Sequence, residues 1–352
     1  MDHKLDSQAP SAPASFLNGQ RAQKEGRWAE AEAAYRETLA SHPNALPALQ
    51  NLAAVLLALG KWDQAEPVMR AALSLGATDP ILRKQLAFSR LAAGDYEEGL
   101  PLYESRRDAA EMRGAVPRFS FPEWEGEPVG SLLLMPEQGL GDQIQFARYV
   151  PLLVARGVRV TLACPPVLRR LFEPLGVALV EATGTISFSP HDAWAMLGSL
   201  PLRFDTRLET IPSPTPIEAK ARTSGGVGVA TRGNPEHPND QNRSLPDSAA
   251  AALLAIPGAI SLLPEHTGAQ DMQETADLIA GLDLVISVDT SIAHLAASMG
   301  KPTRILLPNE RCDWRWMREG ERSPWYPSAR LVRQAREQDW ASVVEVIRAE
   351  LC

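Results

Sequence analysis

The sequence has few cysteines and no long apolar run, which are the features of disulfide-rich, zinc-binding and membrane proteins. Its 352 residues include only three cysteines, Cys164, Cys312 and Cys352, whose spacing supports neither a disulfide framework nor a zinc site. No apolar run approaches the roughly 20 residues that cross a bilayer, so we expect no membrane insertion. The net charge of −8 argues against non-specific nucleic-acid binding, and we expect no nucleic-acid partner.

The sequence also lacks the signals of secretion and of P-loop chemistry. Residues 1–13 are polar and rich in Ala, Pro and Ser, without the basic start and apolar centre of a secretion signal, and we expect a disordered leader there. A reducing, cytoplasmic location fits the cysteine usage. No Gly-x-x-x-x-Gly-Lys-Ser/Thr occurs, which excludes a P-loop protein.

The first third of the chain contains an internal repeat of 34 residues. The triplets Gly26-Arg27-Trp28, Gly60-Lys61-Trp62 and Gly94-Asp95-Tyr96 recur at this interval. Each triplet marks a turn between two helices, and small residues in two further columns allow the helices to pack closely. These columns contain Gly19, Ala53 and Ala87, and Ala31, Ala65 and Gly99.

This pattern resembles the tetratricopeptide repeat and predicts an α-solenoid over residues 14–112. Stacked repeats of this kind leave a concave surface that can hold a protein or peptide partner. The alternative is that the repeats only brace the domain that follows. Residues 113–130 form a linker with three prolines, and we expect Phe119 and Trp124 to pack along the following domain.

Alternating strands and helices follow the linker and predict a domain over residues 131–223. A buried strand at 131–135 leads into the glycine-rich turn 136–142 and an amphipathic helix that starts near Asp142. Further strands are expected at 158–163 and 177–181, with a helix at 166–175 between them. This alternation is typical of a parallel sheet covered by helices.

A second domain of the same kind is expected over residues 224–352. Its predicted strands are 226–230, 259–263, 284–288 and 303–307, separated by helices that start near Pro246, Asp271 and Ser291. Two such Rossmann-like domains bind ligands where the carboxyl ends of their strands face each other.

The stretch from Leu284 to Pro302 is the strongest candidate for a binding site. An apolar run stops at Asp289, and a helical pattern starts at Ser291, so free amides at the helix start can bind an anion. His294 lies on the same helix face as Thr290, one turn further along. The alternatives are an ordinary helix cap at Asp289 or Thr290 and a structural histidine.

Four motifs in order resemble the heptosyltransferase-related bacterial glycosyltransferases of family 9, in the variant fused to tetratricopeptide repeats. The resemblance covers about residues 131–352. It rests on the segments 137–149, 233–244, 287–296 and 313–327, the last of which contains Asp313-Trp314-Arg315-Trp316. It implies a GT-B fold of two Rossmann-like domains and sugar transfer from a nucleotide diphosphate without a metal or other cofactor. The absence of any Asp-x-Asp agrees.

The resemblance also implies residue roles. Asp142 stands where such enzymes place the carboxylate that deprotonates the acceptor, although an aspartate in the first turn of a helix is by default a cap. The implied acceptor-side loop contains Gln138, Gly139, Gly141 and Gln143. The implied donor-binding residues are Asn242, Arg243, Glu274, Asp289, Thr290, Ser291, Ile292 and His294.

Three departures from the family pattern limit this interpretation. The segment 266–271 is short, the strand before Gly233 lacks the usual tryptophan, and Glu274 replaces an aspartate. Two hypotheses follow from the sequence. One is an active glycosyltransferase whose repeats hold a protein acceptor such as flagellin. The other is a scaffold or binding protein whose transferase half has lost turnover.

Overall fold

The computed structural model describes residues 12–108, 116–184, 186–237, 239–309 and 311–351. Contacts divide the chain into a repeat unit, Met1–Arg90 with Pro101–Val116, and an α/β unit, Leu91–Leu100 with Pro117–Cys352. Most of the expected leader (1–11) and the start of the expected linker (113–115) lie outside the described residues. The expected domain boundaries remain predictions.

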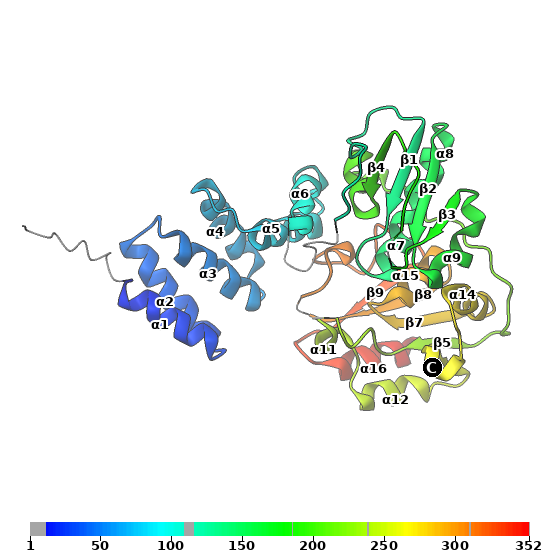
Figure 1. Cartoon of the computed structure of the whole chain (residues 1–352). Coiled ribbons are helices and arrows are strands. Elements are labelled where there is room, and N and C mark those ends of the chain that lie inside the picture. Colours follow the sequence, from blue (N-terminus) through cyan, green and yellow to red (C-terminus); the bar gives the residue numbers. More distant parts are fainter. Residues whose placement is uncertain (1–11, 109–115, 185, 238, 310, 352) are drawn as a thin grey trace, which may run out of the picture. The chain divides into compact units, whose positions relative to one another are not determined.

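The predicted 34-residue repeat forms successive pairs of helices (Figure 1). At the turn within each pair, Gly26, Gly60 and Gly94 have φ values of 72°, 67° and 86°, which disfavour a side chain. A methyl group on Gly19 would lie 2.6 Å from the Tyr35 ring, so the small-residue column does allow close packing. The helices are α1 (Ala14–Lys24), α2 (Trp28–Ser41), α3 (Leu46–Ala58), α4 (Trp62–Ser74), α5 (Pro80–Ala92) and α6 (Tyr96–Tyr103), and a 3₁₀ helix, η1 (Glu104–Asp108), follows.

The first half of the α/β unit is a parallel sheet in the order β3-β2-β1-β4. The prediction missed β4, which is only four residues long. The strands are β1 (Ser131–Met135), β2 (Arg159–Cys164), β3 (Ala178–Glu181) and β4 (Ala193–Met196). The main helices are α7 (Leu140–Phe146), α8 (Val150–Ala155), α9 (Pro166–Phe172) and α10 (Leu200–Arg203), with 3₁₀ turns η3 (Ala147–Tyr149), η4 (Glu173–Leu175), η5 (Leu197–Ser199) and η6 (Leu208–Thr210).

The second half is a parallel sheet in the order β6-β5-β7-β8-β9. The strands are β5 (Val227–Ala230), β6 (Ala259–Ser261), β7 (Leu284–Val288), β8 (Thr303–Leu307) and β9 (Ala329–Arg333). The helices are α11 (Asp240–Arg243), α12 (Asp247–Leu254), α13 (Pro264–Thr267), α14 (Met272–Ala280), α15 (Ser291–Ser298) and α16 (Trp340–Leu351), with the 3₁₀ turn η7 (Trp314–Trp316). In Figure 1, α12 and α16 lie on one side of this sheet, and α14 and α15 lie on the other, toward the first half.

The order of the strands in the two sheets indicates where a ligand is expected to bind. In the first sheet the chain runs from β1 outward to β2 and β3 and then returns to the other side of β1 with β4. In the second sheet β6 and β7 flank β5 in the same way. Ligands of doubly wound sheets bind beyond the strand ends at such switch points. The prediction of tetratricopeptide-type paired helices followed by two Rossmann-like halves is confirmed.

Local boundaries differ slightly from expectation. The helix predicted to start near Asp142 begins at Leu140, and the helix predicted for 166–175 ends at Phe172 and continues as a 3₁₀ turn. The linker does pack along the α/β unit. The Trp124 amide donates to the carbonyl oxygen of Trp194 at 2.7 Å, and Trp124 is only 2% exposed. In the part of the chain that the structure describes, no helix is both long and apolar enough to cross a membrane.

Candidate functional site

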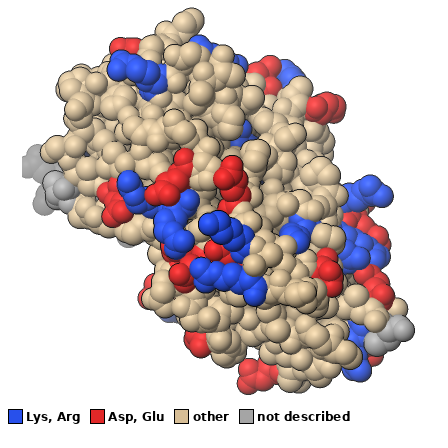
Figure 2. All heavy atoms as spheres, turned by 90° about the vertical axis from the view of Figure 1, so that its right-hand side faces the viewer, with Lys and Arg blue, Asp and Glu red and all other residues tan. Residues whose placement is uncertain are grey.

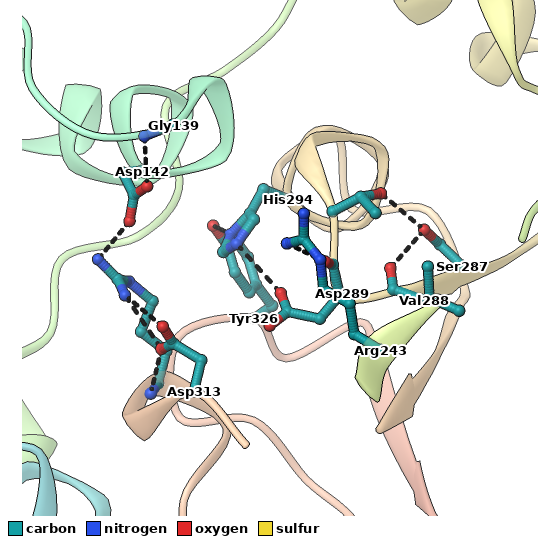
Figure 3. A network of polar contacts seen from close by, with 11 residues as sticks. Gly139, Asp142, Arg243, Ser287, Val288, Asp289, His294, Asp313 and Tyr326 are labelled. Atoms are coloured by element: carbon teal, nitrogen blue, oxygen red, sulfur yellow. Dashed lines mark hydrogen bonds and ion pairs between the residues drawn. The ribbon is translucent and has the colours of Figure 1, made fainter. Parts of the chain in front are cut away.

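The start of helix α15 lies directly after the buried strand β7. Thr290 occupies the N-cap position with extended backbone, but its side chain does not cap the helix. Its hydroxyl instead lies 3.2 Å from that of Ser287, which donates to the Val288 carbonyl (Figure 3). The first amides of a helix have no partner within it, so those of Ser291 and Ile292 are suited to bind an anion.

His294 is a buried, neutral histidine. Its Nδ1 atom lies 2.8 Å from the Tyr326 hydroxyl, and its Nε2 atom lies 3.9 Å from Asp289. Burial and the nearby arginines, with Arg315 contributing most among them, hold the pKa of His294 well below its usual value. The pair with Asp289 is therefore not an ion pair at neutral pH.

Asp289 is itself unusually easy to protonate. Burial and the negative charge of Asp313 raise its pKa to about 7, although Arg243 opposes this effect. Arg243 donates from Nη1 to the Asp289 backbone carbonyl at 3.0 Å and forms an ion pair with Asp240 at 3.2 Å. Arg243 thus fixes the backbone that leads into α15.

Asp142 lies in the first turn of α7, in the other half of the α/β unit. Its Oδ2 atom accepts a hydrogen bond from the Gly139 amide at 2.9 Å, as expected of a cap. Its Oδ1 atom lies 2.5 Å from Nη2 of Arg315, in the second half (Figure 3). Burial raises the pKa of Asp142, while Arg315 acts against this rise. The carboxylate therefore takes part in both a cap and an ion pair.

Arg315 and Asp313 are site residues that the predicted set did not include. Nη1 of Arg315 lies 3.0 Å and 2.9 Å from the two carboxylate oxygens of Asp313, and Arg315 is 3% exposed. Both belong to the segment that carried the family resemblance. The available signal was that charged residues alternate with tryptophans in Asp313-Trp314-Arg315-Trp316, but this spacing gave no indication of a contact with Asp142.

The predicted acceptor-side loop lies where β1 passes into α7. Gln138 has a φ of 59°, an uncommon conformation for a residue with a side chain. A methyl group on Gly141 would lie 2.5 Å from the His294 ring, so α7 and α15 touch at this point. Gln143 is buried, with 3% of its surface exposed. The loop therefore adjoins the start of α15, as the strand orders predicted.

The remaining predicted donor-binding residues are Asn242, Ile292 and Glu274, and Glu274 lies apart from the group above. Asn242 lies in α11 beside Arg243, and Ile292 is buried in α15. Glu274 belongs to a second set of contacts at the start of α14: it accepts from the Gln270 amide and lies 3.9 Å from Arg170 of α9. Arg170 also pairs with Asp271 at 2.8 Å. These contacts join the two halves, and the ribose contact expected of Glu274 stays a prediction.

Charge is mixed rather than segregated on the face shown in Figure 2. Lys and Arg side chains gather near its middle, next to Asp and Glu side chains. Ion pairs between the described residues include Arg170 with Asp271 at 2.8 Å and Arg222 with Asp277 at 3.5 Å. Among the described residues, no group of three or more His, Cys, Asp or Glu side chains is arranged to hold a metal ion.

Aromatic side chains support the segment that carries Arg315. Tyr96, from the third repeat triplet, accepts a hydrogen bond from Nε1 of Trp325 at 2.9 Å and packs edge-on against Trp314. Arg148 bridges the two halves by donating to the carbonyls of Pro212 and Trp325 at 2.9 Å and 3.0 Å. The last repeat turn, within residues 91–100, is thus part of the α/β unit.

Comparison with known families agrees with this arrangement. Residues 22–87 match the tetratricopeptide repeat family, and residues 251–312 match glycosyltransferase family 9 (heptosyltransferase). The chain therefore contains one segment similar to tetratricopeptide repeats and one segment similar to family 9 glycosyltransferases. The family 9 match contains β7, Asp289 and the whole of α15.

The individual proteins that this chain resembles are distant in sequence. Protein FlbA of Caulobacter vibrioides is 26% identical over 363 residues, which cover 84% of this chain and 59% of FlbA. The chain thus spans about three fifths of this curated relative's length. Two solved structures are 12% identical: the iron-containing dodecameric glycosyltransferase TibC from enterotoxigenic E. coli H10407 (TM-score 0.43, covering 64% of this chain and 67% of TibC), and a family 9 glycosyltransferase from Veillonella parvula (TM-score 0.41, 64% and 91%).

Proposed function

We propose that this chain transfers a sugar from a nucleotide-diphosphate sugar to an acceptor hydroxyl. One observation carries the proposal: the Asp142–Arg315 contact brings a carboxylate of the first half next to the second half, which holds the free amides of α15. A glycosyl transfer needs a base for the acceptor and a site for the leaving pyrophosphate, and the two halves each supply one of them.

The donor side stabilises negative charge that develops on the leaving group. The amides of Ser291 and Ile292, with the dipole of α15, favour an anion by typically about 0.3–1 kcal/mol when exposed and by more when water is excluded. Arg243 is positioned at the Asp289 carbonyl, directly before these amides, and adds a positive charge. Neutral His294 can donate a hydrogen bond to the donor without carrying a charge.

The acceptor side supplies the base. In our proposal the ionised carboxylate of Asp142 takes the proton of the acceptor hydroxyl as the oxygen attacks the anomeric carbon. The bond between that carbon and the pyrophosphate oxygen breaks, and the electron pair leaves with the nucleotide. The Arg243 guanidinium and the amides at the start of α15 balance the charge of the pyrophosphate, so the proposal includes no metal ion or other cofactor.

We further propose that the acceptor is a protein or peptide held by the repeats. The paired helices with small residues at their contacts, such as Gly19 against Tyr35, support this proposal because stacked repeats of this kind bind peptides. The buried thiol of Cys164 is free, and this supports a location of the protein in a reducing compartment such as the cytoplasm.

One observation favours the alternative of an inactive scaffold. Both carboxylate oxygens of Asp142 already have partners, Gly139 and Arg315, so the base has to exchange a contact before it can act. A scaffold has no need for such an exchange. Nucleotide binding and turnover separate the two hypotheses.

The test uses the full chain. We would titrate ADP, UDP and GDP by calorimetry and then measure the release of nucleotide from the matching sugar nucleotides. We expect one nucleoside diphosphate to bind and its sugar nucleotide to be hydrolysed slowly without an acceptor. Binding without any turnover would favour the scaffold, and the absence of binding by all three would overturn the donor site.

A further inference from the structure

Arg315 is a buried cation that lies between carboxylates from both halves of the α/β unit. Its Nη2 atom lies 2.5 Å from Asp142 of α7, and its Nη1 atom contacts both oxygens of Asp313 in its own half. The guanidinium lies over two rings, 5.1 Å from the centroid of Phe146 and 4.6 Å from that of Trp314. It is therefore held more firmly than an arginine in an exposed ion pair.

We propose that Arg315 is a positioning residue, which holds the Asp142 carboxylate of the first half in a fixed place against the second half. The proposal rests on the proposed function, in which Asp142 is the base. A buried carboxylate without a partner is costly, and a single guanidinium shared with Asp313 compensates it only in part. Asp142 is thus anchored but remains able to accept a proton.

Every charged group near Asp142 affects this balance. Arg315 favours the ionised carboxylate, whereas Asp313 and Glu137, which follows β1, disfavour it. The Gly139 amide also favours the anion. The pKa of His237 is lowered by burial and by Arg243, while the charge of Asp142 acts against this fall. The net effect of burial and these groups is a pKa of Asp142 above its usual value.

Two substitutions should move the titration of Asp142 in opposite directions. Arg315→Met removes the favourable charge, so the Asp142 pKa should rise by about 1–3 pH units, the range typical of a lost opposite charge nearby. Asp313→Asn removes a repulsive charge and leaves Arg315 to Asp142, so the pKa should fall. Arg315→Lys keeps the charge but not the two-sided geometry, and should give a smaller rise. Arg330→Met, which breaks the pair with Glu350, is the matched control and should leave the titration unchanged.

The experiment reads the titration without any substrate. The full chain is labelled with ¹³C at aspartate carboxylates, and the Asp142 signal is identified as the one missing in Asp142→Asn. Opposite shifts of its midpoint in Arg315→Met and Asp313→Asn support the proposal. An unchanged midpoint in Arg315→Met overturns it. If Arg315→Met does not fold, Asp313→Asn provides the test instead. An Asp142 titration midpoint that is unchanged or higher in Asp313→Asn overturns the proposal.

Turnover provides a second and separate readout. With the sugar nucleotide that the chain hydrolyses, Arg315→Met should lower kcat and move the acid limb of its pH profile upward, while KM for the sugar nucleotide stays the same. If the carboxylate pKa shifts are observed but no nucleotide is released, the positioning role of Arg315 is supported and the proposed glycosyl transfer is contradicted. The two failures are therefore distinguishable.

Discussion

The ring of His294 in helix α15 packs directly on the backbone of Gly141 in helix α7: a methyl group on Gly141 would lie 2.5 Å from the ring Cδ2 atom. This contact joins the two halves of the α/β unit at the residue directly before the proposed base, Asp142. The other side of the same ring contacts Tyr326, whose hydroxyl lies 2.8 Å from Nδ1. The ring thus has little room to move away from α7.

The first prediction concerns this contact. Gly141→Ala should push α7 and α15 apart and destabilise the α/β unit by about 1–3 kcal/mol, as overpacking of a close contact typically does. Urea denaturation measures the change. The double variant Gly141→Ala with His294→Ala removes the opposing ring, so part of the loss should be recovered relative to the sum of the single variants. Additive losses would show that the two residues are not in contact.

The second prediction concerns the base. Asp142→Asn keeps an oxygen for the Gly139 amide, and Arg315 keeps its pair with Asp313, so the fold should be retained. Nucleotide release should fall by a factor of about 10² to 10⁴, the usual contribution of a general base. Asp192→Asn is the control, because Asp192 also accepts backbone amides, those of Gly130 and Ser131, but at the other end of β1. Wild-type turnover of the Asp142 variant would remove the catalytic role.

The third prediction concerns the amides at the start of α15. Ser291 is the first helical residue, where proline is tolerated, and the extended backbone of Thr290 suits a residue before proline. Ser291→Pro therefore removes one amide with little distortion, and calorimetry should show weaker binding of the nucleoside diphosphate. Ser291→Ala, which keeps the amide, separates this effect from the loss of the hydroxyl. Equal affinities of both variants and the wild type would exclude the amide site.

The fourth prediction concerns pH. The pKa of His294 is well below its unfolded value, so the unfolded chain binds the extra proton first as the pH falls. Stability is therefore lost as the pH falls below about 6.5, by up to about 2 kcal/mol at pH 5. Asp289, whose pKa is raised to about 7, acts in the opposite direction between about pH 7 and pH 4.

His294→Gln isolates the histidine contribution. The free energy of unfolding is measured by urea denaturation at pH 7.5 and at pH 5. Between these two pH values, the wild type should lose more stability, or gain less, than His294→Gln. His191→Gln is the control, because His191 is a partly exposed ring that contacts Thr161. The same pH dependence in the wild type and His294→Gln would mean that the buried ring is not held neutral.

The fifth prediction concerns the last repeat turn. Tyr96→Phe leaves the buried Nε1 of Trp325 without its acceptor and should destabilise the α/β unit by about 1–3 kcal/mol. Tyr35→Phe removes a similar bond, to Gln23 in the repeat unit. Hydrogen exchange should show faster opening of the α/β unit in the first variant and of the repeat unit in the second. Loss confined to the repeat unit in Tyr96→Phe would contradict the assignment of residues 91–100.

Local pattern determined much of the architecture. The repeat columns, the buried run of β7 and the start of α15 at Ser291 all follow from residues close together in the sequence. Periodicity and turn residues encode such elements because their backbone hydrogen bonds are local. Strands β4 and β9 were missed because short segments are stabilised by neighbours in the sheet, such as the pairing of Leu133 with Trp194.

The sequence by itself determined which residues lie at the strand ends, and so placed Asp142 in one half and Asp289 with His294 in the other. Only the tertiary structure decided that Asp142 pairs with Arg315, that Asp289 lies beside the buried His294, and that Tyr96 belongs to the α/β unit. Ion pairs and shifted pKa values depend on distances and burial between elements far apart in the chain. Those distances are set by how the helices and sheets pack, which local spacing does not specify.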